Sequence, residues 1–254
     1  MTGARWTAAT AIDAPGTPET EWARWDGLLR LPAAALPRGP VLVVAAHPDD
    51  EVLGFGGTMA TLSADGNDVH LVSVTDGEGS HPRSPLVSPA ELTVMRETEL
   101  EHAVADLGLP GLRPRRLQVP DTRVHQHEGE VRAGITAALR ETGAVLCAAP
   151  WTGDLHSDHE AAGRAAGAAC LAAGVPLWLY PVWMWHWAFP GDERVPWQDA
   201  ARIALPPEAS TRKQRAIQRF TSQIMPLTAS EGDAAILPPE ELAHHMRPFE
   251  VVFR

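Results

Sequence analysis

The stretch Val41-Leu-Val-Val-Ala-Ala-His-Pro-Asp-Asp-Glu51 decides how the rest of the sequence is interpreted. Six small or branched apolar residues are followed, within five positions, by one imidazole and three carboxylates. A short apolar run flanked by Pro40 and Pro48 is typical of a strand buried on both faces. The polar cluster then comes just beyond the C-terminal end of the strand, where open α/β sheets bind ligands.

The segments that follow alternate between strand and helix patterns. A glycine-containing helix after the cluster and an apolar strand at 69–75 complete a βαβ unit, which implies a right-handed crossover and a parallel sheet. Ser88 and Glu91 have the spacing of a capping box and predict the start of a helix. The sequence therefore predicts an α/β fold, a Rossmann-like three-layer sandwich with a mainly parallel sheet. Further strands are expected at 115–119, 144–149, 176–180, 201–204 and 250–253.

We expect residues 1–36 to form an N-terminal arm with a short helix at 21–31, and residues 37–254 to form a single domain. The formal net charge of -11 and the absence of a basic stripe argue against nucleic acid and an anionic membrane surface as partners. Cys147 and Cys170 are too few for a disulfide framework and are expected to be buried thiols. Neither an apolar signal-peptide core nor a run of about 18 apolar residues occurs, which predicts a cytoplasmic protein.

A second polar cluster, Pro150-Trp-Thr-Gly-Asp-Leu-His-Ser-Asp-His-Glu160, follows the predicted strand at 144–149. In a parallel sheet both strand ends lie at the same edge. One His and one Asp from the first loop and a His from the second would form a set of two imidazoles and one carboxylate. This set suits Zn²⁺ at a catalytic site that keeps room for water and substrate, and it also suits Fe²⁺.

The neighbouring carboxylates and imidazoles suit hydrolysis. With two adjacent aspartates, one can bind the metal while the other takes a proton from metal-bound water. His156, as an imidazolium, could stabilise the oxyanion of a tetrahedral intermediate or protonate a leaving amine. Asp158 would then orient and charge His156 through a hydrogen bond.

At these residues the sequence resembles the PIG-L/LmbE-like deacetylase family. The resemblance rests on Ala46-His-Pro-Asp-Asp-Glu51 and His156-Ser-Asp-His159, with support from the segments 75–78, 96–100 and 213–223. It covers the chain from about Val41 to Leu227 and implies an LmbE-like fold. Members of this family are zinc-dependent hydrolases that remove an N-acetyl or related N-acyl group from an amino sugar, commonly N-acetylglucosamine linked to another group.

The resemblance assigns a role to each motif residue. It implies that His47, Asp50 and His159 bind the metal and that Asp49 is the general base. His156 would stabilise the oxyanion or act as acid, with Asp158 behind it.

By the same resemblance, Arg96 and Asp121 would lie near the sugar hydroxyls. Both residue types also occur at such positions for purely structural reasons. Arg96 could form an ion pair with Glu99 on a helix surface, and Asp121 could belong to the turn after Pro120.

The tryptophan-rich segment from Tyr180 to Pro190 also follows a strand, so it should reach the same edge. Its aromatic rings could stack on a sugar or an apolar aglycone, pack into a core, or form an oligomer contact. His186 is expected to be a structural histidine. His125, His127, His244 and His245 are expected at the surface.

The sequence thus predicts an enzyme, a metal-dependent hydrolase of a linear amide bond in a small-molecule N-acylated amino sugar or glycoconjugate. In this hypothesis Zn-bound water, deprotonated by Asp49, attacks the acyl carbonyl. One alternative is a phosphoester hydrolase with Mg²⁺ at Asp49, Asp50 and Glu51, although two histidine ligands disfavour so hard a cation. Another is a non-catalytic sugar-binding protein. The oligomeric state, homo-oligomers included, is left open.

Overall fold

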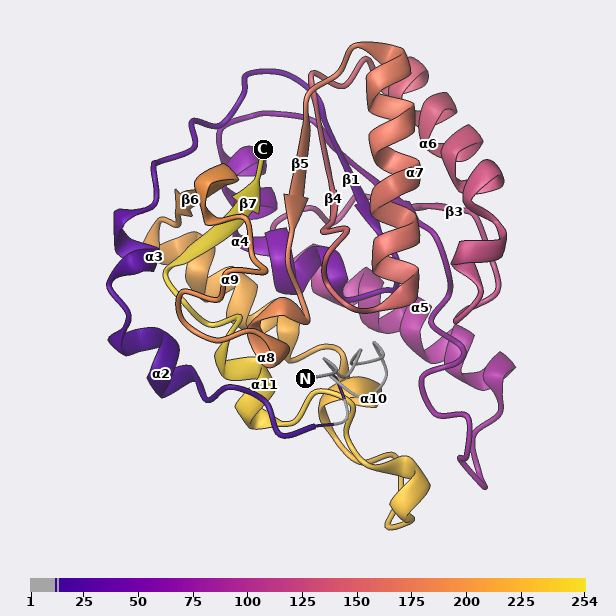
Figure 1. Cartoon of the computed structure of the whole chain (residues 1–254). Coiled ribbons are helices and arrows are strands. Elements are labelled where there is room, and N and C mark those ends of the chain that lie inside the picture. The colour runs from indigo at the N-terminus through magenta and orange to yellow at the C-terminus, as the bar shows by residue number, and fades with distance from the viewer. Residues whose placement is uncertain (1–11, 13) are drawn as a thin grey trace, which may run out of the picture.

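A computed structural model of the chain describes residue 12 and residues 14–254, so residues 1–11 and 13 of the predicted arm lie outside the described part. Seven strands form one sheet in the order β3-β2-β1-β4-β5-β7-β6 (Figure 1). Neighbours from β3 to β5 pair in parallel, whereas β7 pairs antiparallel with both β5 and β6. The strands are β1 (Val41–Ala45), β2 (Val69–Ser73), β3 (Arg115–Arg116), β4 (Leu146–Pro150), β5 (Leu177–Tyr180), β6 (Ala200–Ala204) and β7 (Phe249–Phe253).

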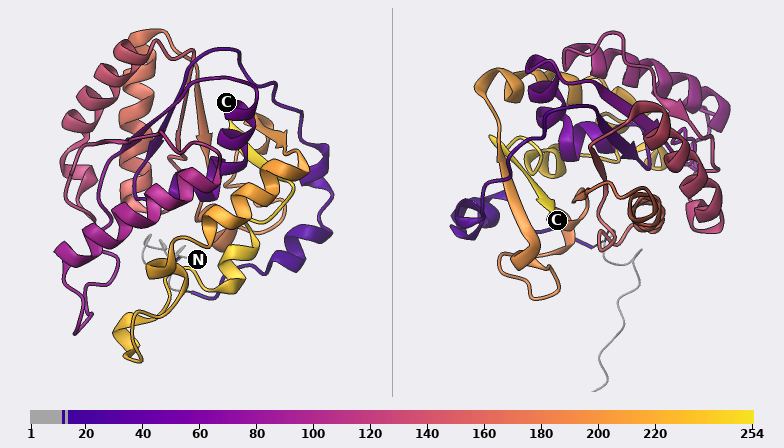
Figure 2. Two further views of the ribbon diagram at one scale, coloured as in Figure 1. Left: turned by 180° about the vertical axis from the view of Figure 1, so that it is seen from behind. Right: turned by 90° about the horizontal axis from the view of Figure 1, so that it is seen from above.

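Strand β1 is buried on both faces, as the continuous apolar run predicts. Val41, Val43 and Ala45 belong to the core beneath α4 (Asp50–Ala64), α5 (Pro89–Asp106) and α9 (Pro207–Ile217). Leu42 and Val44 belong to a second core, beneath α6 (Glu128–Thr142) and α7 (Ser157–Ala173). Helix α7 faces the viewer in Figure 1, and α5 and α9 cover the opposite face in the left panel of Figure 2. The predicted three-layer α/β sandwich is confirmed.

Helix α7 approaches β4 closely because its sequence is rich in alanine and glycine. A Cβ atom on Gly163 would lie 2.4 Å from the carbonyl oxygen of Pro150, well inside van der Waals contact. Farther along α7, a Cβ atom on Gly167 would meet only Leu177 Cδ2, at an ordinary 3.8 Å. The absence of a Cβ atom at Gly163 therefore allows the N-terminal half of α7 to lie this close to the end of β4.

The strand order places a topological switch point between β1 and β4. The chain runs outward from β1 through β2 to β3 on one side and through β4 to β5 on the other. The crossovers leave a crevice at the carboxyl ends of the two central strands, which is the usual ligand site of such sheets. Both polar clusters follow these strands directly, at residues 46–51 and 151–160.

The N-terminal segment differs from the predicted single helix. The single helix predicted at 21–31 is two short helices, α2 (Glu19–Arg24) and α3 (Gly27–Arg30), and Leu29 is exposed.

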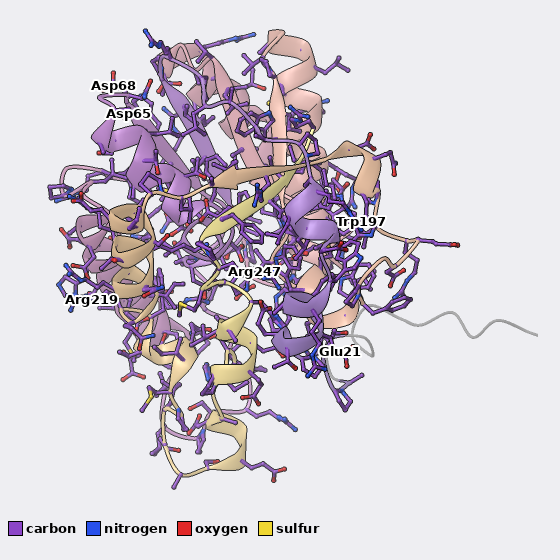
Figure 3. The ribbon with its side chains drawn as sticks, turned by 90° about the vertical axis from the view of Figure 1, so that its left-hand side faces the viewer. Glu21, Asp65, Asp68, Trp197, Arg219 and Arg247 are labelled. Atoms are coloured by element: carbon purple, nitrogen blue, oxygen red, sulfur yellow. The ribbon has the colours of Figure 1, made fainter. Side chains whose placement is uncertain are left out.

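The C-terminal segment contacts α2 through Arg247, labelled in Figure 3. The Arg247 guanidinium packs 4.1 Å from the ring centroid of Trp185 and donates to Glu19. The remaining helices are α8 (Met184–Trp187), α10 (Thr221–Ile224) and α11 (Pro239–Ala243), with short 3-10 turns at 124–126, 197–199 and 231–233.

The surface positions predicted for His244 and His245 are wrong, because both side chains are buried. Nδ1 of His244 lies 2.8 Å from a carboxylate oxygen of Glu19, and Nδ1 of His245 lies 3.2 Å from the carbonyl oxygen of Leu53. His125 is exposed, as expected, and His127 is half-buried. Within the described residues, none of the helices is long and apolar enough to cross a membrane.

Candidate metal centre

The two polar clusters meet at the switch point. Asp50 is the first residue of α4, and His156 is the N-cap residue of α7, which carries His159 in its first turn. Nδ1 of His47 lies 3.5 Å from Asp50 Oδ2, and Nε2 of His159 lies 3.2 Å from Asp50 Oδ1. The two imidazole nitrogens are 3.3 Å apart. The structure therefore brings together the three side chains predicted to bind the metal.

The separations between these atoms fit a metal ion. Ligand atoms held about 2.1 Å from one tetrahedral ion lie about 3.4 Å apart, close to the 3.3 Å between the two imidazole nitrogens and to the distance from each imidazole to one of the two Asp50 oxygens, Oδ2 for His47 and Oδ1 for His159. A nitrogen of His156 also lies within 4.8 Å of nitrogens of His47 and His159, so the wider donor set contains three imidazoles. Imidazole and carboxylate donors suit Zn²⁺ or Fe²⁺.

His47 is oriented by carboxylates on its far side. Its Nε2 lies 3.0 Å from Asp121 Oδ1 and 3.3 Å from Asp158 Oδ2, so this nitrogen carries the proton and Nδ1 faces Asp50. The carboxylates are themselves held by backbone N–H groups: Gly79 donates to Asp121, and Thr122 donates to Asp158. Asp121 is thus part of the support of His47, as well as lining the cavity next to it.

The expectation that Asp158 hydrogen-bonds to His156 with its carboxylate is wrong. The Asp158 carboxylate accepts from the backbone N–H groups of Thr122 and Val124 and lies beside His47. Only the backbone N–H of Asp158 contacts His156, donating to Nδ1 over 3.3 Å. The reason is that Asp158 is in the first turn of α7, where its side chain points to the loop at 122–124 and not back to the N-cap residue.

His156 is half-buried, and its ring centroid lies 4.9 Å from that of His47 and 4.5 Å from that of His159. Burial lowers the pKa of His156 well below its usual value, and positive charge on His159 and His47 lowers it further. Since Nδ1 accepts a hydrogen bond, the neutral ring carries its proton on Nε2. In the metal-free site the lowered pKa and the hydrogen bond to Nδ1 favour a neutral ring over the imidazolium that we expected.

His159 has a partner that the sequence did not identify. Nδ1 of His159 lies 2.7 Å from Oδ2 of Asp154, a fully buried carboxylate. Burial alone would lower the pKa of His159, but the carboxylates of Asp50 and Asp154 raise it to about 9. Asp154 follows Gly153 in a loop, so the sequence offered only a turn signal there.

Asp49 is held beside the predicted ligands in an unusual backbone conformation, with φ at 144°. Such a φ is costly for a residue with a Cβ atom and is often found at functional sites. Its Oδ2 accepts from Arg96 Nη2 over 2.9 Å. Burial raises the pKa of the Asp49 carboxyl to about 7, against the opposing effect of the Arg96 guanidinium.

Arg96 is buried, so the alternative of a surface ion pair with Glu99 is wrong. Its guanidinium donates to the carbonyl oxygens of Pro48 and Gly77 and to Asp49. Gly77, at φ 69°, leaves room for it, because a Cβ atom there would lie 2.1 Å from Arg96 Nη1. Glu99 instead accepts from Thr221 and Ser222.

Glu51 has no role among the predicted zinc ligands and is fully buried at the start of α4. Its Oε2 accepts from the Asp49 N–H over 3.3 Å, and its Oε1 has no hydrogen-bond partner among the described residues. Burial raises the pKa of Glu51 to about 8, with a further contribution from the Asp49 charge. A carboxyl that stays protonated in this way suits support of the Asp49 backbone better than binding of a cation.

The metal-site residues form the floor of a cavity of about 850 Å³. Arg96, Asp121, Ser80 and Gln223 extend its polar part. The outer walls are largely apolar and come from distant parts of the chain, namely Pro15, Leu53, Val182, Trp183, Ile236, Leu237 and Pro238.

The tryptophan-rich segment has a mixed role. Trp183 lines the cavity, whereas Trp185 packs against Trp22. Trp178, which precedes the segment in β5, is buried in the core beneath α4. His186 also borders the cavity, but its nitrogens lie 2.6 Å from Glu241 Oε1 and 2.8 Å from the carbonyl oxygen of Ala14. These contacts fit the structural role predicted for His186.

Fold and site together define an α/β protein with a candidate metal centre at the switch point of its sheet. Residues 42–170 match the family described as PIG-L, GlcNAc-PI de-N-acetylase. Because this match covers just over half of the 254 residues, the chain belongs to the PIG-L family. The family predicted from the two motifs is confirmed.

Curated relatives carry deacetylase names. The 1D-myo-inositol 2-acetamido-2-deoxy-alpha-D-glucopyranoside deacetylase of Rhodococcus opacus (strain B4) is 34% identical in an alignment of 188 positions that covers 64% of this chain and 59% of the relative. The diacetylchitobiose deacetylase of Thermococcus kodakarensis is 34% identical over 139 residues, 54% of this chain and 51% of the relative. The chain therefore spans 59% and 51% of the lengths of these relatives.

Solved structures share the fold. The N,N'-diacetylchitobiose deacetylase from Pyrococcus horikoshii is 25% identical, with a TM-score of 0.56 over 71% of this chain and 68% of that chain. The A40926 pseudoaglycone deacetylase Dbv21 has a TM-score of 0.64 and covers 85% of this chain and 97% of its own. Its identity of 21% makes this a likeness of fold alone.

Proposed function

We propose that this chain is a metal-dependent N-deacetylase that hydrolyses the acetamide of an amino-sugar conjugate, with Zn²⁺ or Fe²⁺ at His47, Asp50 and His159. The observation that carries the proposal is the convergence of these three side chains, with separations of 3.2 to 3.5 Å, directly beside the buried carboxylate of Asp49. The deacetylase names of the family relatives support the reaction type.

A metal bound at this site would act as a Lewis acid that polarises the acyl carbonyl and lowers the pKa of water. Arg96 holds Oδ2 of Asp49, so we propose that Oδ1 takes the proton as the water oxygen bonds to the acyl carbon. The neutral His156, with its proton on Nε2, would donate a hydrogen bond to the carbonyl oxygen as negative charge develops there.

The second half of the reaction returns the proton. When the C–N bond breaks, the amine nitrogen needs a proton, and a neutral His156 is a poor source of one. We propose that Asp49 delivers the proton that it took from water, which leaves acetic acid, the free amine and an ionised Asp49. The acetic acid then loses its remaining proton to solvent or to the amine and leaves as acetate. The pKa of about 7 for Asp49 in the metal-free site suits a group that both accepts and donates a proton near neutrality.

The polar part of the cavity would bind the sugar. Asp121 and Arg96 border the floor, but both are already held by hydrogen bonds, so their remaining acceptor and donor atoms would contact sugar hydroxyls. Trp183 offers an aromatic surface against the outer part of the substrate. A small-molecule glycoconjugate is therefore the proposed substrate class, and location in the cytoplasm stays a prediction from the sequence.

The two alternative functions, phosphoester hydrolysis and non-catalytic sugar binding, explain fewer features of the site. A phosphoester hydrolase with Mg²⁺ would be expected to present mainly oxygen ligands, whereas two or three imidazoles face this centre. A non-catalytic sugar-binding protein has no need of a strained, buried carboxylate beside a metal site.

The test is amine release from N-acetylated sugars. Purified protein, stripped of metal and reloaded with Zn²⁺, Fe²⁺ or Mg²⁺, is incubated with diacetylchitobiose, with 1D-myo-inositol 2-acetamido-2-deoxy-alpha-D-glucopyranoside, and with a p-nitrophenyl phosphate ester. We expect free amine from at least one acetamide with Zn²⁺ or Fe²⁺ and none after chelation. Phosphate release with Mg²⁺, and no amine with any metal, would contradict the proposal.

A further inference from the structure

The carboxylate of Asp154 joins the candidate metal centre to the wall of the substrate cavity. The side chain is completely buried, in the loop between β4 and α7. One oxygen, Oδ2, accepts from His159 Nδ1 over 2.7 Å and from the backbone N–H of Trp183 over 2.9 Å. The other oxygen, Oδ1, accepts from the N–H groups of Met184 and Val182 over 2.8 and 3.1 Å.

The first set of contacts fixes the chemical form of His159. Because Nδ1 donates to Asp154, the lone pair of the neutral ring is on Nε2, which faces Asp50 and His47. A carboxylate behind a metal-binding histidine orients the ring and strengthens it as a ligand. Without this acceptor, the ring would be free to place its proton on Nε2, where it would oppose a cation.

The second set of contacts fixes the tryptophan wall. The three consecutive N–H groups of Val182, Trp183 and Met184 precede or begin α8, a helix of four residues. Trp183 lines the cavity from this turn. The carbonyl oxygen of Asp154 also accepts from Trp187 Nε1 over 3.2 Å. The turn thus depends on Asp154 at both its main chain and its side chain.

The backbone next to Asp154 is itself constrained. Leu155 has a φ of 60°, in the left-handed region that residues with a branched side chain rarely adopt. Conformations of this kind persist where the surrounding contacts hold them. The four N–H partners of the Asp154 carboxylate supply such contacts, so the loop is held in one arrangement relative to both His159 and Trp183.

We propose that Asp154 is a positioning residue with two roles. It keeps His159 in the tautomer whose Nε2 can bind a metal, and it holds the Trp183 turn against the same cavity. This inference rests on the proposed function, since it names how the deacetylase site is assembled. One consequence is that loss of the Asp154 charge changes metal affinity and substrate affinity together. A change in the wall alone leaves metal affinity intact.

The variants separate these effects. Asp154→Asn keeps the size of the side chain but replaces one acceptor oxygen by an NH2 donor. This donor must face the N–H groups either of His159 and Trp183 or of Val182 and Met184. Trp183→Phe alters the wall only. Asp192→Asn is the matched control, because Asp192 is a buried aspartate just after the tryptophan-rich segment whose carboxylate binds Arg194, away from the metal residues.

The first measurement needs no substrate. Zinc affinity of the stripped proteins is determined by competition with a chelator. We expect a roughly 10- to 100-fold loss for Asp154→Asn and wild-type affinity for Trp183→Phe and Asp192→Asn. Wild-type affinity in Asp154→Asn, or an equal loss in Asp192→Asn, would overturn the proposal. If Asp154→Asn does not fold, the imidazole nitrogen NMR shifts of the wild-type apoprotein at pH 10, above the pKa of about 9 for His159, decide instead: we expect the proton of the neutral ring on Nδ1, and a proton on Nε2 alone would overturn the proposal.

The second measurement is steady-state kinetics on an acetamide that the wild type cleaves. At saturating zinc we expect KM to rise in both Asp154→Asn and Trp183→Phe and to stay unchanged in Asp192→Asn. An unchanged KM in Asp154→Asn would overturn its role in the wall. If the wild type cleaves no acetamide, the proposed function fails, whereas the zinc affinities and the His159 proton still decide the role of Asp154 at the metal.

Discussion

Nη2 of Arg96 lies 2.9 Å from Oδ2 of Asp49, and both side chains are buried. Arg96 comes from the middle of α5 and reaches the loop after β1, where it also donates to the Pro48 carbonyl oxygen. The guanidinium therefore supports both the charge of Asp49 and its strained backbone. Arg96, which we expected near the sugar, thus mainly supports Asp49, the proposed base.

Replacing Arg96 by methionine should therefore affect both stability and turnover. Removing one member of a buried ion pair leaves the other charge uncompensated and costs about 3–5 kcal/mol of unfolding free energy. We expect that loss in urea unfolding, together with a fall in kcat at saturating zinc. Arg219→Met is the control, because Arg219 pairs with Asp106 at the surface of the molecule (Figure 3). Equal effects of the two substitutions would contradict this role of Arg96.

The contact of His186 with Glu241 should make stability depend on pH. The hydrogen bond to Glu241 raises the pKa of His186, more than burial lowers it. A raised folded-state pKa means that the contribution is fully present below the unfolded value of about 6.5 and is lost as the pH rises through the folded value. We expect Glu241→Gln to lower the unfolding midpoint at pH 5.5 more than at pH 9.

Glu208→Gln is a suitable control for that experiment, because Glu208 forms an exposed pair with Arg212 on one helix. It should change the midpoint little at either pH. A loss in Glu241→Gln that is the same at pH 5.5 and pH 9 would show that the His186 charge does not stabilise the fold. The contact ties α8 to α11, and His186 also bonds to the segment at Ala14.

Two glycines of α7 should respond oppositely to alanine. At Gly163 the new Cβ atom would lie 2.4 Å from the Pro150 carbonyl oxygen, so helix and strand must separate, at a cost of about 1–3 kcal/mol. At Gly167 the nearest heavy atom outside the helix backbone would be 3.8 Å away, so the higher helix propensity of alanine should add up to about 1 kcal/mol. Urea unfolding of both variants tests the close contact, and equal shifts of the same sign would refute it.

Features set by neighbouring residues could be predicted from the sequence. The apolar run forms a strand at 41–45 that is buried on both faces, and Ser88 and Glu91 form the expected capping box. The metal-site candidates could also be predicted, because strand polarity alone places the ends of β1 and β4 at one edge. His47 and His159 are 112 residues apart in the chain, but their nitrogens lie 3.3 Å apart.

Features that depend on contacts between distant loops could not be predicted. The N–H donors to the Asp154 carboxylate come from the turn at 182–184, which follows a different strand, so the sequence around Asp154 does not indicate its role. Asp158 lies beside His47 because the loop at 122–124 captures its carboxylate. The sequence near His244 indicates no partner, so a surface position was predicted. In the structure His244 is buried, and its Nδ1 lies beside the carboxylate of Glu19, 225 residues earlier in the chain.

The proposed general-base role of Asp49 can be measured by comparing two proteins. Wild type and Asp49→Asn, each loaded with zinc, are assayed for metal content and for amine release from the same N-acetylated sugar. Asp49 does not belong to the three proposed ligands, so we expect both proteins to hold one zinc per chain. Turnover in Asp49→Asn should fall by roughly 10²- to 10⁴-fold, the usual contribution of a general base. Full turnover in that variant at full zinc occupancy would contradict the general-base role.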